Sequence, residues 1–170
     1  MKKLIIALTL IFASTGLFAQ KYAYVDTEYI MNNIPTYETA QQQLNELSEQ
    51  WKSEIDEMKA EIEKMYEDFK SEKVFLTDEL KAKREEEIIQ KEKEMRQLQQ
   101  EYFGREGLLF QKRKELLKPI QDDIFNAVKE IAQEGNYAVI FDTANSMNML
   151  YTDPKYDKSD DVLRKLGYKN

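Results

Sequence analysis

One long stretch of the chain contains neither glycine nor proline, and this stretch limits the possible folds more than any other feature. It runs from Thr36 to about Lys73 and consists mainly of Glu, Gln, Lys, Leu, Met and Ile, which are mostly strong helix formers. As a single α-helix of about 37 residues it would be roughly 55 Å long. The sequence therefore predicts a mostly helical protein built around at least one long helix.

Apolar residues recur along this stretch every three or four positions, which is the spacing of a coiled-coil seam. The seam positions are Leu44, Leu47, Trp51, Ile55, Met58, Ile62, Met65 and Phe69. One extra residue near Trp51 predicts a stutter, where the supercoil unwinds locally. The pattern indicates that this helix packs against another helix.

A second long helix is predicted to begin after a short break at Val74–Thr77. Thr77 is a suitable N-cap, and two acidic residues follow it at the positive end of the helix. Two helices joined by a tight turn form an antiparallel hairpin. We therefore expect residues 37–118 to form a coiled-coil hairpin, which we call the arm.

The second helix has one regular apolar stripe and one mixed stripe. The regular stripe repeats every seven residues at Ile88, Met95, Tyr102, Leu109 and Leu116. The mixed stripe alternates between apolar and basic residues at Leu80, Arg84, Lys91, Leu98, Arg105 and Lys112. Folding the hairpin places Ile62 opposite Ile88, Met58 opposite Lys91 and Trp51 near Leu98. Because the basic side chains can only lay their methylene groups along the seam, we expect an arm that forms but flexes.

Glycine and proline interrupt the later part of the second helix. Gly104 and Gly107 lie inside the predicted helix, where each costs about 1 kcal/mol relative to alanine. Pro119 should kink or restart the helix, which then continues to Gly135. The sequence thus predicts a soft point near the two glycines and a change of direction at the proline.

Two segments on either side of the arm, residues 20–36 and 119–170, are predicted to form a small α+β body. Short strands are expected at Tyr22–Asp26, Tyr137–Asp142 and Met147–Tyr151, the last two as a hairpin. Thr27 and Ser159 are suitable caps for two short helices. Because so small a body is marginal as an independent core and its sheet would have open edges, we expect it to oligomerise.

The first nineteen residues have the pattern of a secretory signal peptide. Lys2 and Lys3 precede an apolar run from Leu4 to Phe18, and Ala19 offers a small residue for cleavage. A membrane anchor is the alternative, but the run is short and contains Thr9, Ser14 and Thr15. Cleavage after Ala19 would yield an exported mature protein.

Composition excludes several classes of function. The chain has no histidine and no cysteine, which excludes Ser-His-Asp triads, thiol nucleophiles, disulfides and the usual zinc sites. With 25 basic and 32 acidic residues and a net charge of −7, non-specific nucleic-acid binding is not expected. Neighbouring acids such as Asp122 and Asp123 point about 100° apart on a helix, so no enzyme activity, cofactor or metal site is predicted.

Several features together resemble the Skp/OmpH family of periplasmic chaperones. They are the leader, the Tyr24-Val25-Asp26 strand, the charged helical hairpin, Pro119-Ile120-Gln121, and the strand from Tyr137 to Asp142 followed by Thr143-Ala144-Asn145. The resemblance implies a homotrimer with a body and tentacle-like arms, whose cavity holds unfolded outer-membrane β-barrel proteins as an ATP-independent holdase. Well-known members of that family are basic, whereas this chain is acidic.

Apolar side chains that a two-helix hairpin cannot bury are the candidates for client binding. We assign this role to Tyr66, Phe75, Leu76 and Phe103. A second candidate surface is a basic cluster near the tip of the arm, which could contact anionic lipid weakly or simply be solvated. It comprises Lys70, Lys73, Lys81, Lys83 and Arg84. The alternative function is a structural coiled-coil adaptor of the cell envelope.

Overall fold

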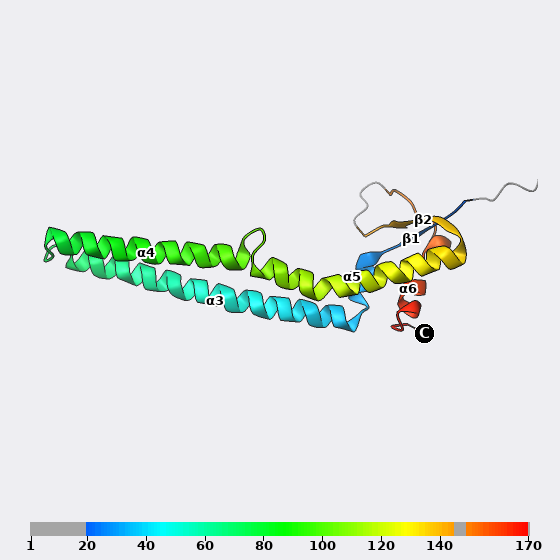
Figure 1. Ribbon diagram of the computed structural model, residues 1–170, viewed down its shortest axis with the longest axis horizontal. Coiled ribbons are helices and arrows are strands. Elements are labelled where there is room, and N and C mark those ends of the chain that lie inside the picture. Colours follow the sequence, from blue (N-terminus) through cyan, green and yellow to red (C-terminus); the bar gives the residue numbers. More distant parts are fainter. Residues whose placement is uncertain (1–19, 145–148, 170) are drawn as a thin grey trace, which may run out of the picture. The chain divides into compact units, whose positions relative to one another are not determined.

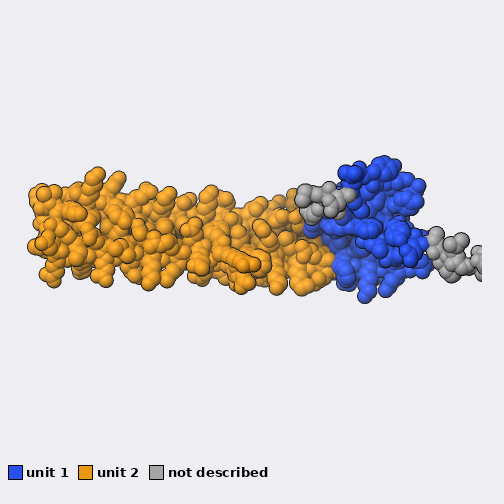
Figure 2. Space-filling model, turned by 90° about the horizontal axis from the view of Figure 1, so that it is seen from above, with its two compact units in different colours: residues 1–33, 123–170 blue, residues 34–122 orange. Residues whose placement is uncertain are grey.

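The computed structural model describes residues 20–144 and 149–169 of the chain. The segment assigned above to a signal peptide lies outside the described residues. The chain divides into two compact units, one of residues 34–122 and one of residues 1–33 with 123–170 (Figure 2). We describe each unit by itself.

The unit of residues 34–122 contains two long helices packed side by side, α3 (Pro35–Glu72) and α4 (Asp78–Phe103) (Figure 1). Pro35 occupies the first turn of α3, where its missing N–H would have no partner in any case. Thr77 caps α4 by accepting a hydrogen bond from the Leu80 N–H at 3.3 Å. A long helical hairpin is therefore present.

The helix does not continue through the two glycines. α4 ends at Phe103, and the next helix, α5, runs from Leu108 to Gly135. Between them Gly104–Gly107 form a loop, in which the Gly107 N–H donates to the Gly104 carbonyl at 2.9 Å. The expected continuous helix is thus wrong at this point.

Pro119 lies inside α5, so the restart that the sequence allowed does not occur, while the kink stays a prediction. The helix is assigned without a break from Leu108 to Gly135 with Pro119 inside it. Pro119 and Glu115 are both exposed, so water can bond the Glu115 carbonyl that proline leaves without an amide donor. Solvent therefore makes the proline tolerable here.

The other unit contains a two-stranded parallel sheet of β1 (Lys21–Val25) and β2 (Tyr137–Asp142). Ala23 pairs with Ile140 and Val25 with Asp142. Parallel strands need a crossover connection, and here the crossover contains all of α3 and α4. Among the described residues, one isolated bridge joins Tyr24 of β1 to Asp157 on the other side.

Short helices close the core of this unit. α2 (Thr27–Asn32) contacts α6 (Ser159–Lys165), and a 3-10 turn, η1 (Pro154–Tyr156), precedes α6. Ile30, Val162 and Leu163 are the most deeply buried side chains. The core therefore joins segments from the two ends of the described chain.

The third predicted strand is not formed in the part of it that is described. Met149, Leu150 and Tyr151 have no strand pairing, and Met147 and Asn148 lie outside the described residues. Leu150 is 99% exposed and Tyr151 is 83% exposed. Nothing in the described chain covers the side chains of Leu150 and Tyr151. An apolar composition was therefore not sufficient to form a strand here.

Both predicted caps of the short helices are displaced by one residue. Asp26, not Thr27, caps α2 by accepting from the Tyr29 N–H at 2.9 Å. Lys158 occupies the cap position of α6, and Ser159 is buried as its first residue. The Ser159 hydroxyl accepts from the Asp26 N–H at 2.9 Å, and this long-range bond accounts for its position.

Candidate functional site

An open groove of about 510 Å³ lies between α3 and α4 toward the tip of the hairpin. Tyr66 and Ile89 form part of it and remain 47% and 59% exposed. Its lining residues are Tyr66, Glu67, Phe69, Lys70, Lys73, Glu85, Ile88 and Ile89. The groove thus offers apolar and aromatic walls with charged groups at the edge.

A hydrogen bond across the hairpin orients Tyr66. Its hydroxyl donates to the Glu92 carboxylate at 3.0 Å. This hydrogen bond is the main cause that raises the pKa of Tyr66 above its usual value. The hydrogen bond ties the Tyr66 side chain to Glu92 across the hairpin, and the side chain remains exposed at the groove.

The turn between α3 and α4 exposes apolar side chains. Val74 is 85% exposed and Phe75 is 89% exposed, whereas Leu76 is half-buried. Sequence reasoning singled out Phe75 and Leu76 but left Val74 aside. The tip of the hairpin is therefore apolar and accessible in a single chain.

An aromatic cluster lies at the other end of α4. The Trp51 indole stacks on Tyr102 with ring centroids 4.8 Å apart, and Phe103 is edge-on to both at 6.4 Å. Phe103 remains 38% exposed. The expected neighbour of Trp51 was Leu98, and the stacking partner is Tyr102, about one helical turn further on.

The predicted seam residues differ in burial. Leu44, Ile62 and Ile88 are buried, and Leu80 is 47% exposed. The half-buried members are Leu47, Trp51, Ile55, Met58, Met65, Phe69, Met95, Leu98 and Tyr102. A hairpin of only two helices leaves most of its seam partly in contact with solvent.

Lys91, which was predicted to lie opposite Met58 in the seam, also forms an ion pair. Its ammonium group forms an ion pair with Glu61 at 2.8 Å. The hydrogen bond to Glu61 is the main cause that raises the pKa of Lys91. The stem can therefore cover the seam while the charge is satisfied at the surface.

Three of the five cations near the tip have acidic partners. Lys73 lies 3.8 Å from Glu85, Lys81 lies 3.1 Å from Asp78, and Arg84 lies 3.3 Å from Glu87. Lys70 and Lys83 form no ion pair with any described residue. The positive charge available for an external partner is smaller than the sequence cluster indicates.

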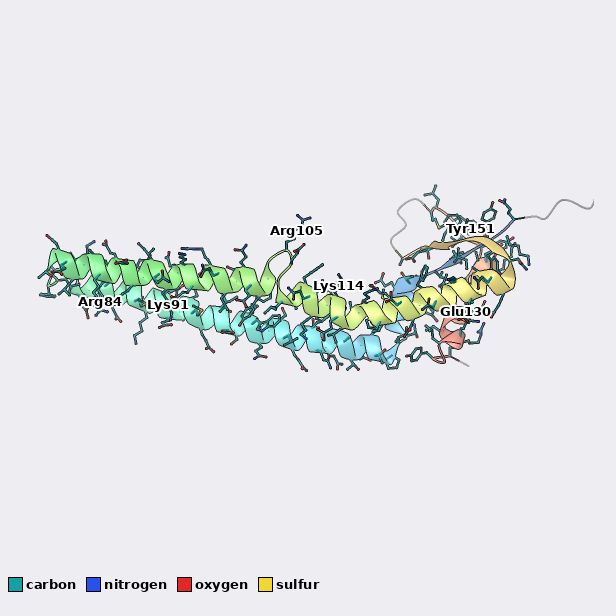
Figure 3. The ribbon with its side chains drawn as sticks, in the orientation of Figure 1. Arg84, Lys91, Arg105, Lys114, Glu130 and Tyr151 are labelled. Carbon is teal, nitrogen blue, oxygen red and sulfur yellow. The ribbon has the colours of Figure 1, made fainter. Side chains whose placement is uncertain are left out.

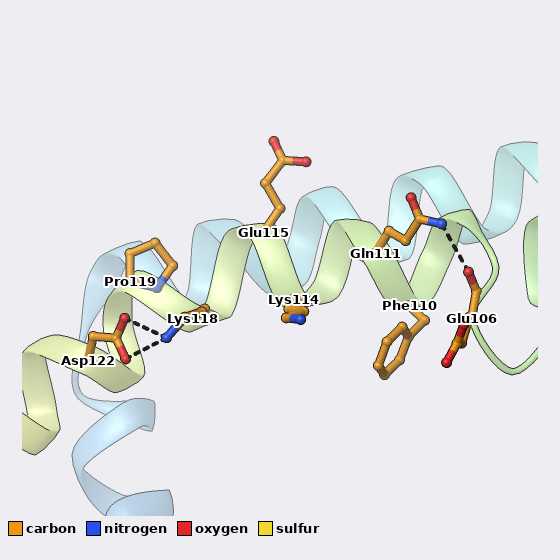
Figure 4. Close-up of a pocket in the computed structure, with 8 residues that line it drawn as sticks. All are labelled: Glu106, Phe110, Gln111, Lys114, Glu115, Lys118, Pro119 and Asp122. Atoms are coloured by element: carbon orange, nitrogen blue, oxygen red, sulfur yellow. Dashed lines mark hydrogen bonds and ion pairs between the residues drawn. The ribbon is translucent and has the colours of Figure 1, made fainter.

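A second hollow, of about 800 Å³, lies along the exposed side of α5 (Figure 4). Phe110, which is 52% exposed, lines it together with Pro119. Lys118 lies beside them and bonds both carboxylate oxygens of Asp122 at 2.9 and 2.8 Å. Charged side chains are distributed along the long helices, and Figure 3 labels Arg84, Lys91 and Lys114 among them.

Sequence reasoning did not single out several exposed apolar residues of the other unit. Val139 and Phe141 on β2 are 42% and 44% exposed, and Phe125 on α5 is 66% exposed. The continuous apolar run of Tyr137–Asp142 was the available signal, because such a run carries apolar side chains on both faces of the strand. The sheet therefore exposes apolar surface.

The described helices include none with the length and apolarity needed to span a membrane. The arrangement instead provides open apolar surface along a charged hairpin. Such a surface can hold apolar segments of another molecule weakly, and its methionines can adapt to different shapes.

Two of three comparisons with known proteins find a match. The fold is similar to the crystal structure of a candidate outer membrane chaperone (OmpH-like) from Caulobacter crescentus CB15. The TM-score is 0.68 at 12% sequence identity, with 89% of this chain and 86% of that chain covered. A search of curated proteins finds no match. The model of the family described as outer membrane protein (OmpH-like) matches residues 21–166, and the chain therefore belongs to this family.

Proposed function

We propose that this protein is a periplasmic holdase chaperone that binds unfolded outer-membrane β-barrel proteins and prevents their aggregation. The observation that supports this most directly is the exposed apolar surface of the hairpin at Tyr66, Phe75 and Phe103. The likeness to an OmpH-like candidate chaperone points to the same function. The client-binding residues are Tyr66, Phe75, Leu76 and Phe103.

Binding by this surface requires no chemical step. Apolar side chains of an unfolded client lose contact with water when they lie against the groove and the tip. Most seam residues are only half-buried, and the seam includes the charged residue Lys91. The two helices are therefore held loosely enough to adjust to different client segments. The proposed holdase therefore acts without ATP.

The second part of the proposal is that the mature protein acts as a homotrimer. Val139 and Phe141 on the short sheet, together with Leu150 and Tyr151, present apolar surface that another copy could cover. Three arms would then surround a shared space for the client. A trimer would also offer each client several weak contacts at once.

The third part concerns the tip and weak contact with anionic lipid. Lys70 and Lys83 carry the charge available for such contact, and each basic residue near an anionic surface adds about 1 kcal/mol at low salt. Flotation with anionic and with neutral vesicles tests it. Weak flotation on anionic vesicles that Lys70→Gln/Lys83→Gln abolishes is the expected result, and equal behaviour with both vesicles would contradict it.

One experiment tests assembly and cargo together. The mass of the mature protein is measured by light scattering with and without a urea-denatured outer-membrane β-barrel protein, and client turbidity is followed on dilution. Without client we expect the mass of a trimer, and with client the mass of a trimer plus one client. Protection from turbidity should be unchanged when apyrase removes nucleotide. A structural adaptor would leave the client to aggregate.

A further inference from the structure

The apolar stripe of the second helix and the path of its backbone disagree at one place. Tyr102 and Leu109 are seven residues apart, the same spacing that separates Met95 from Tyr102 and Leu109 from Leu116. The periodicity thus counts residues 104–107 as helical. In the structure these residues form a loop that stands off the line of α4 and the first turns of α5 (Figure 1).

The loop can form only because both of its ends are glycine. A Cβ atom added at Gly104 would lie 2.3 Å from the Gln100 carbonyl oxygen. A Cβ atom at Gly107 would lie 2.7 and 2.8 Å from the carbonyl oxygens of Glu101 and Tyr102. These oxygens belong to the last turn of α4, so they cannot move without unwinding it. A continuous helix has no such restriction and favours alanine.

Few interactions hold the loop in place. The Gly104 N–H donates to Gln100 O at 2.8 Å and the Gly107 N–H to Gly104 O at 2.9 Å. Gln111 donates from its backbone N–H to Gly107 O at 3.1 Å and from its side chain to Glu106 O at 3.0 Å, so each of these bonds is local. Arg105 and Glu106 are exposed and form no ion pair with any described residue. Rearranging the loop therefore breaks little tertiary structure.

We propose that Gly104–Gly107 exchange between two conformations. One is the loop seen here, and the other is a helical turn, which we call the inserted form. In the inserted form α4 and α5 are one continuous helix. The four added residues lengthen it by about 6 Å and rotate it by about 40° beyond one full turn. The apolar stripe then continues from Tyr102 to Leu109 without interruption.

Insertion would change the geometry of the hairpin at the level of Trp51. α3 is unbroken there and has no segment to release, so only one of the two helices lengthens. With helix axes 8–10 Å apart, a difference of about 6 Å corresponds to a bend of roughly 35°. Tyr102 would be drawn out of its stack on Trp51, where the predicted stutter of α3 already weakens the supercoil.

The charge of Arg105 favours the looped form in the natural sequence. Insertion would place Arg105 at a seam position, where only its methylene groups pack well. The loop instead keeps Arg105 in solvent. The balance between the two forms therefore depends on two glycines that permit the loop and one basic residue that disfavours insertion.

Spin labels test this directly, because the natural chain has no cysteine. Labels at Lys93→Cys and Arg113→Cys report the distance from α4 to α5, and labels at Lys52→Cys and Lys64→Cys within α3 serve as an internal ruler. In the full mature protein, Gly104→Ala/Gly107→Ala should move the main Lys93–Arg113 distance outward by about 6 Å. Helix propensity alone shifts the ratio of forms roughly 30-fold.

A second readout and a matched variant complete the test. The emission of Trp51, the single tryptophan, should change in the glycine variant as its stack on Tyr102 is lost. Ser53→Ala/Gln99→Ala raises helix propensity without touching the loop and should leave both readouts unchanged. A glycine variant that is less stable but keeps the natural distance would overturn the proposal, because the loop would then be a fixed feature.

Arg105→Leu keeps the test decisive if the glycine variant does not fold. Leucine at this position retains the loop glycines and gains burial only when the helix is continuous. The longer Lys93–Arg113 distance should therefore become more populated in Arg105→Leu than in the natural sequence. A single short distance in both proteins would refute an inserted form.

Discussion

The indole of Trp51 stacks on the phenol ring of Tyr102, with ring centroids 4.8 Å apart and ring planes 12° apart. The stack joins α3 to the end of α4. The Tyr102 hydroxyl also donates to the Glu54 carboxylate at 2.8 Å. This contact sets the pairing of the two helices next to the loop at Gly104–Gly107.

Removing this stack should destabilise the hairpin more than any other single change near it. For Trp51→Ala we expect a loss of about 2 kcal/mol in the free energy of unfolding, less than for a fully buried tryptophan because Trp51 is half-buried. Urea unfolding followed by far-UV circular dichroism measures it. Trp51→Phe keeps an aromatic ring and should lose less than half as much. Equal stability of all three proteins would show that the stack does not hold the helices together.

Client protection should depend on the exposed aromatic residues of the arm. In Tyr66→Ala/Phe75→Ala/Phe103→Ala, we expect the concentration that half-protects a denatured β-barrel protein to rise roughly ten-fold, since about 1.4 kcal/mol of apolar contact is lost. Light scattering after dilution from urea measures the effect. The matched control is Tyr156→Ala/Tyr168→Ala, which removes exposed tyrosines of the other unit. Unchanged protection by the triple variant would refute the assignment of the binding surface.

Stability of the hairpin should decrease at alkaline pH. Hydrogen bonds to Glu92 and Glu54 raise the pKa of Tyr66 and of Tyr102 above the usual 10.0. A raised pKa in the folded state stabilises the protein fully below the unfolded value and less as pH rises through the folded value. Urea unfolding between about pH 8 and about pH 11 should therefore show a free energy that is level up to about pH 10 and falls above it.

The double variant Tyr66→Phe/Tyr102→Phe isolates the tyrosine contribution to this pH dependence. It should be less stable than the natural protein near neutral pH and lose less stability as the pH rises. Part of the slope should remain, because the hydrogen bond to Glu61 likewise raises the pKa of Lys91. Identical slopes for the two proteins would mean that the tyrosine hydrogen bonds do not contribute.

The core between α2 and α6 should be sensitive to cavities. Leu163 is 1% exposed, and Leu163→Ala should cost about 3 kcal/mol of unfolding free energy, the usual range for a buried leucine. Leu80→Ala removes the same atoms from a half-exposed position and should cost under about 1 kcal/mol. Differential scanning calorimetry compares the two variants. Similar melting temperatures would contradict the burial of Leu163.

Local patterns predicted most helices correctly because their causes lie within a few residues. The long run without glycine or proline predicts α3, and the Thr77 cap predicts the start of α4. The prediction failed at Gly104, where local rules gave a continuous helix, and the restart that they allowed at Pro119 does not occur. Backbone contacts with Gln100 and access of water to Glu115 reversed these outcomes, and neither can be read from spacing.

The candidate binding surface was only partly predictable. Apolar residues in excess of the seam pointed to Tyr66, Phe75 and Phe103, because a two-helix hairpin has too little interior to bury them. The sequence analysis made no prediction for Val139 and Phe141, whose exposure depends on what packs against the sheet. The ion pairs of Lys81 and Arg84 join residues three apart on one helix, so their spacing could have predicted them. The pairing of Lys73 with Glu85 depends on how the hairpin folds.

The sequence by itself determined the helical hairpin, its seam and the apolar turn at its tip, because helix propensity, caps and periodicity act over short distances. Only the tertiary structure decided that β1 and β2 pair in parallel, that Ser159 is buried against Asp26, and that Trp51 stacks on Tyr102. These contacts join residues far apart in the chain. Their partners are selected by how whole elements pack, and no local pattern records that choice.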